Sequence, residues 1–228
     1  MDAIRTIAEK YKLAVVEDCA QAVSAEYRGK KVGSLGDAGC FSLHPLKTLN
    51  ACGDGGVLTT KNKDVYEKIL TLRDNGLYKH RCICWSNNSR LDTLQAAMLL
   101  VKLDYLEEWT QERRDNASFY QEHLNGILEV QLPMEEKRMR PVYHTFIIQV
   151  ERRDKLQSFL AEQGIVTKVH YDVPIHLQPI ARELGYGKGS LPVTERQAEK
   201  VLSLPISGHL NKEMLEYIVN SIRDFYRK

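Results

Sequence analysis

Residues 2–18, DAIRTIAEKYKLAVVED, decide the fold. Apolar residues at positions 4, 7, 8 and 11 form the stripe of an amphipathic helix over residues 2–11. Residues 13–16 are a short, wholly apolar run that ends in Glu17 and Asp18, a pattern typical of a strand buried on both faces. A helix followed by a buried strand predicts an α/β layer with parallel strands.

Further elements follow along the first half of the chain. The sequence predicts a hairpin or loop at 27–39, strands at 40–43 and 57–60, a helix at 62–73 and a long, largely buried helix from 89 to about 123. Three strands are few, because open α/β sheets usually have about five. We therefore expect the first sheet to be completed by an N-terminal part or by a partner.

The second half changes in character after the long helix. Its pattern predicts strands at 127–132, 142–150 and 165–171, a loop at 173–192, and helices at 153–163, 193–202 and 211–226. We therefore expect two domains. Residues 1–115 would form a partial large domain that includes the connecting helix, and residues 116–228 a smaller C-terminal α/β domain.

Composition and charge exclude several classes of protein. Apolar residues make up 43% and charged residues 27% of the 228 residues, which is enough apolar material for a core and argues against disorder. The net charge is only +2, whereas nucleic-acid binders usually carry a larger or more clustered basic excess. No apolar stretch approaches the roughly 20 residues of a membrane span. We expect neither a nucleic-acid nor a membrane partner.

The cysteines and the N-terminal stretch bear on the compartment. Five cysteines, an odd number at irregular spacing, indicate reduced thiols and a cytoplasmic protein. The first residues alternate charged and apolar side chains and lack the continuous apolar core of a signal peptide. Cys82 and Cys84 form a C-x-C pair, for which buried small side chains are a better interpretation than a zinc site. No metal is expected.

Lys47 is the first candidate for chemistry. It follows the apolar run 40–43 and precedes a Gly-rich stretch, and a lysine beside a strand end can attack carbonyl groups and form imines. A lone loop lysine is far more often solvated, so its neighbours decide. Asp18 lies at the end of the first strand, where α/β sheets bind ligands. The alternative role for Asp18 is the N-cap of a helix starting at Cys19.

Other polar residues could share this pocket. Gln21 follows Asp18 by three residues, and Ser42 and His44 alternate with an apolar residue on the second strand, so both point the same way. Ser42 could donate to a phosphate. Further on, Ser89 and Asp92 predict the N-cap and capping box of the long helix, a helix end that could also bind an anion.

Six motifs together resemble one family. The segments EDCAQA, FSLHPLKTL, GDGGVLTT, LRDNG, NSRLDTLQAA and VHYDVPIHLQP occur in the order and spacing of the DegT/DnrJ/StrS family. These proteins are aminotransferases of fold type I that depend on pyridoxal 5′-phosphate (PLP) and act on nucleotide-linked keto-sugars. The resemblance covers essentially the whole chain. It implies an incomplete α/β/α large domain followed by a small α/β domain.

The resemblance also implies roles for particular residues. Lys47 matches the lysine that bonds to PLP and later moves the proton, and Asp18 matches the acid that pairs with the pyridine nitrogen. Gln21 matches a residue near the phenolic oxygen of the ring, and Ser42 a phosphate ligand. Asn88 matches an asparagine that reaches the phosphate in the neighbouring subunit, which implies a homodimer with shared active sites.

The remaining implications concern the substrate and the missing part. Five residues lie in motifs near the family's substrate pocket: His44, Arg90, His170, Tyr171 and His176. The expected partners are a nucleotide-linked keto-sugar and an amino donor, glutamate by analogy. The resemblance begins about two-fifths into a family member, before which the family carries a phosphate-binding loop and an aromatic residue that stacks on PLP.

Three functions therefore remain open from the sequence. The first is an aminotransferase of amino-sugar and polysaccharide biosynthesis. The second is a truncated, non-catalytic homologue that acts as a pseudo-subunit or is a remnant. The third is a generic α/β binding domain, which would make the combination of Lys47, Asp18 and Asn88 a coincidence.

Overall fold

The computed structural model describes residues 1–227, which divide into two compact units. Unit 1 comprises Met1–Gln111 and Glu135–His144, and unit 2 comprises Glu112–Met134 and the chain from Thr145 onward. The expected boundary at 115/116 differs from this division in two ways. The chain passes from one unit to the other within α4 (Leu106–Leu124), and it returns to unit 1 for ten residues. Residue 228, the end of the expected second domain, lies outside the described residues.

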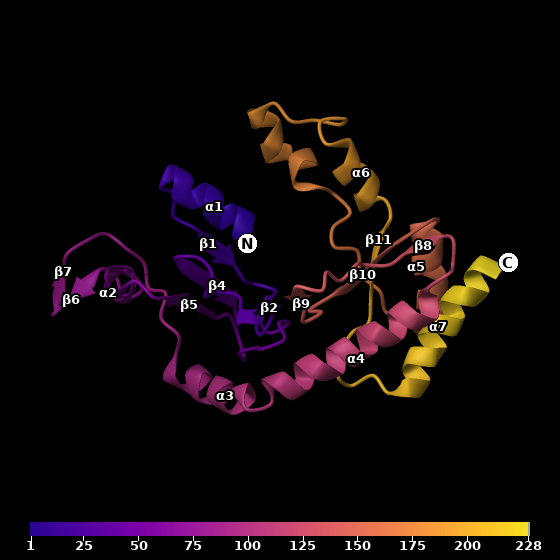
Figure 1. Ribbon diagram of the computed structural model, residues 1–228, viewed down its shortest axis with the longest axis horizontal. Helices are drawn as coiled ribbons and strands as arrows, with labels where there is room; N and C mark the ends of the chain where they lie inside the picture. Colours follow the sequence, from indigo (N-terminus) through magenta and orange to yellow (C-terminus); the bar gives the residue numbers. More distant parts are fainter. Residues whose placement is uncertain (228) are drawn as a thin grey trace. The chain divides into compact units, whose positions relative to one another are not determined.

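The main sheet of unit 1 has three strands in the order β1-β4-β5 (Figure 1). They are β1 (Val16–Asp18), β4 (Ala38–Ser42) and β5 (Gly56–Thr60), and α1 (Asp2–Tyr11) leads into β1. β1 runs parallel to β4, which confirms the expected parallel layer, whereas β5 runs antiparallel to β4. Because β1 and β4 are parallel, their carboxyl ends lie at the same edge of the sheet.

The expected burial of the first strand is wrong for this chain. The strand begins at Val16, three residues later than expected, and Leu13 and Val16 are 59% and 64% exposed. Within residues 1–227, β1 pairs only with β4, so its other edge has no strand beside it. Ile4 and Ile7 of α1 are also more than half exposed. The apolar run does mark the first strand, but one edge of that strand is unpaired within residues 1–227.

Smaller hairpins complete unit 1. β2 (Glu26–Tyr27) and β3 (Lys30–Lys31) form the expected hairpin, closed by Arg28 and Gly29, both of which have positive φ as a two-residue turn requires. β9 (Met139–Arg140) adds to the other edge of β2 and brings residues 135–144 back to this unit. The other elements are α2 (Lys63–Leu72), capped by Asn62, and the hairpin of β6 (Leu77–Tyr78) and β7 (Arg81–Cys82).

The long helix expected from 89 to 123 is two helices. α3 spans Thr93–Leu103, and α4 begins at Leu106. Between them the backbone tightens, because the amides of Asp104 and Tyr105 donate to carbonyls three residues back. The expected cap is also wrong, since Asp92 rather than Ser89 is the N-cap residue and its side chain makes no capping bond.

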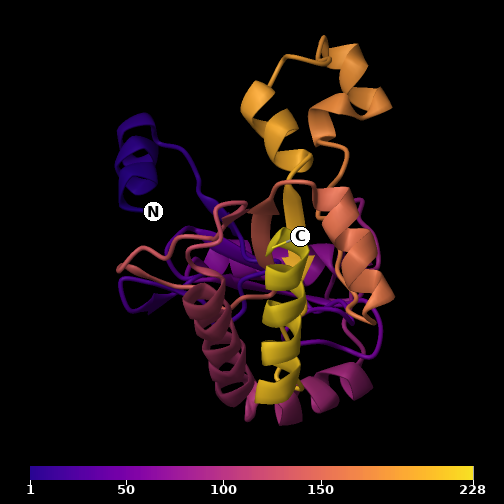
Figure 2. The ribbon, with the colours of Figure 1, turned by 90° about the vertical axis from the view of Figure 1, so that its right-hand side faces the viewer.

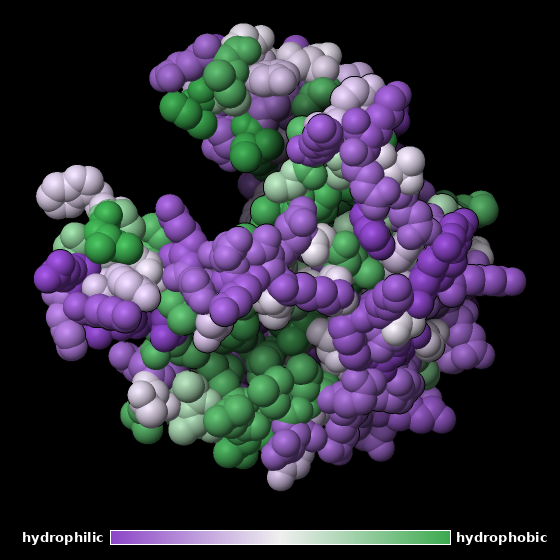
Figure 3. Space-filling view, turned by 60° about the vertical axis from the view of Figure 1, so that its left-hand side comes forward, coloured by the Kyte–Doolittle hydropathy of each residue, from purple (hydrophilic) through white to green (hydrophobic). Residues whose placement is uncertain are grey.

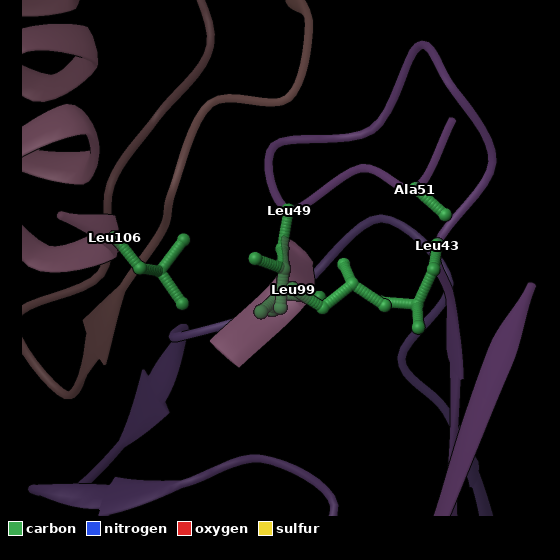
Figure 4. Packing of buried hydrophobic residues seen from close by; sticks show 6 residues of the cluster. Leu43, Leu49, Ala51, Leu99 and Leu106 are labelled. Atoms are coloured by element: carbon green, nitrogen blue, oxygen red, sulfur yellow. The ribbon is translucent and has the colours of Figure 1, made fainter. Parts of the chain in front are cut away.

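The expected burial of α3 on most sides is wrong as well. Only Leu99 of α3 is buried, whereas Leu94, Leu100 and Val101 are more than 60% exposed. Leu99 packs into a small core cluster with Leu43, Leu49, Ala51 and Leu106 (Figure 4).

Unit 2 is built on an antiparallel sheet in the order β11-β10-β8. Its strands are β8 (Val130–Gln131), β10 (Phe146–Val150) and β11 (Val201–Leu204). Along β10 burial alternates strictly, which is the two-residue period of a strand with one core face. β11 was expected to be the end of a helix at 193–202. That helix, α6, instead ends at Ala198.

Two helices cover this sheet (Figure 2). α5 (Arg153–Glu162) and α7 (Lys212–Arg227) pack together through Phe159 and Phe225, and Arg223 of α7 donates to the carbonyl of His123 in α4. The expected loop at 173–192 contains two short 3₁₀ helices, η1 (Ile175–Leu177) and η2 (Pro179–Leu184), followed by α6 (Pro192–Ala198). Among residues 1–227, no helix combines the length and the apolar character needed to cross a membrane.

Candidate active site

The shared edge of β1 and β4 organises the candidate site in unit 1. Asp18 is in register with Cys40, and Ser42 lies two residues further along β4, at the same edge. The chain then turns through residues 43–55, which carry Lys47, before β5 begins. The topology thus puts the carboxylate, the hydroxyl and the lysine turn at the strand ends where α/β folds bind ligands.

Asp18 presents its carboxylate to solvent. One oxygen, Oδ1, accepts a hydrogen bond from the amide of Ala20 at 3.0 Å, and no bond inside the described chain occupies the other oxygen. Residues 19–25 are turns rather than a helix, so the alternative role of Asp18 as a helix cap is wrong. Gln21 is exposed in the same turn.

The Lys47 turn is tight and partly exposed. The amide of Lys47 donates to the carbonyl of His44 at 2.8 Å, and the side chain is half-buried. Within residues 1–227 its ammonium has no hydrogen bond or ion pair. Ser42 Oγ accepts from the amide of His44 at 3.3 Å, which leaves the hydroxyl hydrogen free to donate. The imidazole Nδ1 of His44 accepts from the amide of Leu46, so the exposed ring is held in place.

Asn88 and Arg90 lie in an exposed loop ahead of α3. Asn88 Oδ1 accepts from both the amide and Nε of Arg90, each at 3.2 Å, and Asn88 bridges to Asp74 through the backbone. Arg90 Nε also lies 3.6 Å from Asp74 Oδ1. The loop is therefore ordered by its own side chains. The side-chain nitrogen of Asn88, Nδ2, has no partner among the described residues and can donate a hydrogen bond to a ligand.

The other three expected substrate residues belong to unit 2. His170 and Tyr171 line a hollow of about 600 Å³ between residues 170–178 and α6. His170 Nδ1 lies 2.8 Å from Ser203 Oγ, and Tyr171 is exposed. His176 is only 4% exposed, and its Nε2 lies 3.0 Å from Glu195 Oε1. His176 therefore ties this segment to α6 through Glu195.

Three residues with structural roles beside the site were not identified from sequence. Glu17 is buried, and its carboxylate accepts from the amides of Gly33, Leu35 and Gly36 at 2.7–2.9 Å. Gln95 and Lys102 of α3 bind the backbone after Lys47. The only sequence signal for Glu17 is its position opposite a Gly-rich loop, and the helical spacing of Gln95 and Lys102 gives no hint of their partners.

The donor set at the sheet edge fits PLP. A lysine amine, an acid for the pyridine nitrogen and a hydroxyl for the phosphate are the groups that a PLP site needs, and all three are available at one sheet edge. Cys82 is exposed and Cys84 is only partly buried, so the expectation that this pair forms buried small side chains is wrong. No group of three metal-binding side chains occurs in residues 1–227.

Comparison with known proteins places this geometry in context. The model of the DegT/DnrJ/EryC1/StrS aminotransferase family matches residues 1–223. A Geobacillus stearothermophilus protein named "Pleiotropic regulatory protein" is 43% identical over the whole chain, which spans 62% of that protein. A dTDP-3-amino-3,4,6-trideoxy-alpha-D-glucose transaminase of Streptomyces venezuelae is 39% identical over 99% of this chain and 60% of its own.

Solved structures agree with the sequence comparison. The crystal structure of S. venezuelae DesV in complex with a ketimine intermediate matches all of this chain and 62% of its own, with a TM-score of 0.96 and 38% identity. An aminotransferase from Brucella abortus matches with a TM-score of 0.92 and 32% identity, again over about three-fifths of its length. On these matches, the chain belongs to the DegT/DnrJ/EryC1/StrS family of PLP-dependent aminotransferases and spans about three-fifths of the length of its relatives.

Proposed function

We propose that the chain carries the lysine-bearing part of an aminotransferase that moves an amino group from a donor such as glutamate to a nucleotide-linked keto-sugar. The observation that carries the proposal is the shared edge of β1 and β4, with Asp18, Ser42 and the Lys47 turn beside one another in one sheet. Relatives named as transaminases of dTDP-linked and UDP-linked amino sugars support this substrate class. Such sugars serve amino-sugar and polysaccharide biosynthesis.

Asp18 and Lys47 divide the chemistry between them. When bound, PLP supplies an electron sink for the Cα–H bond of the amino donor. The carboxylate oxygen of Asp18 that has no partner within residues 1–227 would accept from the pyridinium N–H and favour the protonated form of that nitrogen. Lys47 Nζ would hold the cofactor, and the same amine, when free, would act as the base that takes the proton from Cα of the donor and as the acid that gives it back. Since this amine has no partner within residues 1–227, it changes role without breaking a structural contact.

The polar groups around this pair bind and orient. Ser42 would donate its free hydroxyl hydrogen to the phosphate, and Gln21, which is exposed beside Asp18, would bind the phenolic oxygen of the ring. His44 and Arg90 are exposed in unit 1 and contact the substrate. Within unit 2, His170 and Tyr171 line the hollow beside α6, and His176 supports the same segment from inside.

We further propose a homodimer with shared sites. Leu94, Leu100 and Val101 leave an apolar face on α3, and Figure 3 shows apolar surface gathered in the lower part of that view, over this helix. Apolar patches of this kind mark protein interfaces. Asn88 lies just ahead of α3, where its free amide could reach the phosphate bound by a second copy. The free state of all five cysteines supports a cytoplasmic location.

The alternative is a non-catalytic homologue that acts as a pseudo-subunit or is a remnant, and the uncovered surface on α1 and β1 bears on it. The chain spans about three-fifths of its relatives, and within residues 1–227 one edge of β1 is unpaired while apolar residues of α1 and β1 are exposed. A surface of this kind is normally covered by further polypeptide. The generic binding domain without PLP is not favoured, because the family match covers residues 1–223.

The test is covalent capture of the cofactor. The purified chain is titrated with PLP, reduced with borohydride and digested, and the modified lysine is identified by mass spectrometry. We expect the adduct on Lys47, none in Lys47→Ala, and unchanged capture in Lys63→Ala, an exposed lysine of α2. Turnover is then measured with glutamate and dTDP- or UDP-linked keto-sugars. A folded chain that captures no PLP would contradict the aminotransferase and favour the pseudo-subunit.

A further inference from the structure

The loop that carries Lys47 is anchored at its two ends on a single residue. Leu43, which is 1% exposed, donates its amide to the carbonyl of Gly55 and accepts from the amide of Ala51, both at 2.8 Å. Residues 44–50, the tip of this loop, therefore form a closed turn, in which Thr48 and Leu49 are buried. The bond from the amide of Lys47 to His44 shapes the tip but does not fix it to the rest of the unit. Contacts from another element of unit 1 are therefore needed to fix the position of the tip.

One side chain of α3, that of Gln95, binds the backbone of Cys52 in the second half of the loop, as a neighbouring strand would. Gln95 Oε1 accepts from the amide of Cys52 at 2.8 Å, and Gln95 Nε2 donates to the carbonyl of Cys52 at 3.0 Å. Two bonds to the backbone N–H and C=O of one residue fix its orientation as well as its position. A shorter or apolar side chain at position 95 could not make both bonds.

A second side chain of α3 reaches the tip itself. Lys102 Nζ donates to the carbonyl of Asn50 at 2.8 Å and to Asn50 Oδ1 at 2.6 Å. Asn50 Nδ2 in turn donates to the carbonyl of Pro45 at 3.1 Å. Pro45 is two residues from Lys47, so a continuous polar chain links α3 to the lysine turn. Lys102 is half-buried and has no carboxylate partner within residues 1–227.

The two contacts belong to one stripe of the helix. Gln95, Leu99 and Lys102 follow the helical spacing of i, i+4 and i+7, which puts them on the same face. Between the polar pair, Leu99 packs in the cluster that includes Leu49 and Ala51 (Figure 4). α3 therefore contacts the loop with a polar, an apolar and a second polar group in succession.

We infer that Gln95 and Lys102 are positioning residues for Lys47, which they hold through Cys52 and through Asn50 and Pro45. The inference rests on the proposed function, because it assigns the loop a purpose only if Lys47 bonds to PLP. The same helix follows directly on the loop of Asn88, so the Lys47 turn and the proposed interface loop are fixed to one rigid element. Neither residue touches the cofactor.

The test compares Lys102→Met with Lys102→Arg and with Lys68→Met, which removes an exposed lysine of α2. The first readout is hydrogen–deuterium exchange of residues 43–55 in the chain without added PLP. We expect Lys102→Met to raise exchange in this loop about tenfold, as the loss of roughly 1.4 kcal/mol of local stability would. Lys102→Arg should keep most of the protection, and Lys68→Met should match the wild type.

A second variant separates the two links. Asn50→Asp keeps an acceptor for Lys102 but cannot donate to Pro45, so it should loosen residues 44–48 while residues 50–52 stay protected. Gln95→Met should do the reverse. Unchanged loop exchange in folded Lys102→Met and Gln95→Met would overturn the inference, and so would a loss of protection spread evenly over unit 1.

The cofactor arm distinguishes this inference from the proposed function. At a PLP concentration that half-saturates the wild type, Lys102→Met should lower borohydride capture on Lys47 severalfold, and excess PLP should restore it. If even the wild type captures no PLP, the proposed function fails, while the exchange data still decide whether α3 holds the loop. Loosened loops that capture PLP as well as the wild type would overturn the positioning role.

Discussion

At the scale of single residues, Glu17, the neighbour of Asp18 on β1, fixes the backbone of the loop at residues 33–36. Its buried carboxylate accepts three backbone hydrogen bonds from residues 33–36. Gly36 in this loop cannot be replaced by a larger residue without a backbone shift, because a Cβ at position 36 would lie 2.6 Å from the carbonyl oxygen of Val15. The two neighbours on β1 thus have different roles. The carboxylate of Glu17 fixes the backbone of residues 33–36, while the carboxylate of Asp18 stays exposed for a ligand.

We predict that Glu17→Gln lowers the free energy of unfolding by about 1–3 kcal/mol, because an amide replaces one acceptor oxygen and turns its N–H groups toward backbone donors. Urea denaturation measures the change. Glu9→Gln is the control, since Glu9 is exposed and has only a surface pair with Arg5 at 3.7 Å, worth at most about 1 kcal/mol. Equal effects in both variants would contradict a stabilising role for the three hydrogen bonds that Glu17 accepts.

Cys19 and Cys52 should differ sharply in reactivity. Burial, with smaller contributions from the carboxylates of Glu17 and Asp18, raises the pKa of Cys19 to about 11. Cys52 is exposed. Since the thiolate is the reacting form, iodoacetamide at about pH 8 should label Cys52 and spare Cys19 in the folded chain. Mass spectrometry of the digest reads the labelling, and urea should make the two equal. Equal labelling without urea would contradict the structure.

Residue chemistry was only partly predictable from the sequence. Asp18, Ser42 and the Lys47 turn could be assigned to one sheet edge, because strand ends are visible in local patterns and parallel pairing aligns them. Glu17, Gln95 and Lys102 could not be assigned, since their partners are backbone groups 16 to 52 residues away in sequence. His176 was grouped with the substrate residues by its motif, but the structure buries it against Glu195.

At the scale of elements, α6 holds η1 and the loop that follows η2 through one carboxylate. Glu195 accepts from His176 Nε2, and its oxygens also accept from the amides of Gly189 and Leu191. These hydrogen bonds, that of His176 first, hold the pKa of Glu195 below its ordinary value of 4.5. A lowered carboxyl pKa stabilises the fold above the ordinary value, and that stability is lost as the pH falls through the lowered pKa.

We therefore predict that residues 185–191 lose exchange protection between about pH 6 and about pH 3, after correction for intrinsic rates. Glu195→Gln should remove most of this protection already at about pH 6 and flatten the pH dependence. Glu199→Gln, an exposed residue just beyond the end of α6, should behave like the wild type. The assignment to Glu195 fails if both variants show the same pH profile.

Elements with a clear local period were predicted well. α1, α2, α5 and α7 lie within a few residues of their expected bounds, because each has an apolar stripe or a capping residue of its own. β9 and β11 were missed, since two and four residues acquire strand geometry only by pairing with distant partners. The break between α3 and α4 was missed because no glycine or proline marks residues 104–105.

At the scale of the whole molecule, unit 1 leaves two apolar surfaces uncovered, one on α1 and β1 and one on α3. If α3 forms the dimer interface, Leu100→Glu should shift the chain toward a monomer in sedimentation velocity, because it would bury a charge without a partner. Ile7→Glu, which changes the other apolar surface, is the matched control and should not alter self-association. The reverse pattern would assign the interface to α1 and β1.

A site shared between two subunits predicts more than self-association, because variants of its two halves should complement each other in a mixed dimer. If each site combines Lys47 of one subunit with Asn88 of the other, Lys47→Ala and Asn88→Ala should both lose PLP capture or bind it weakly. Refolded together, they form mixed dimers in which one site has both residues intact and the other has neither. Random pairing should then restore Lys47-linked capture to about a quarter of the wild-type level. Capture equal to the sum of the separate variants would show that Asn88 serves its own subunit or none.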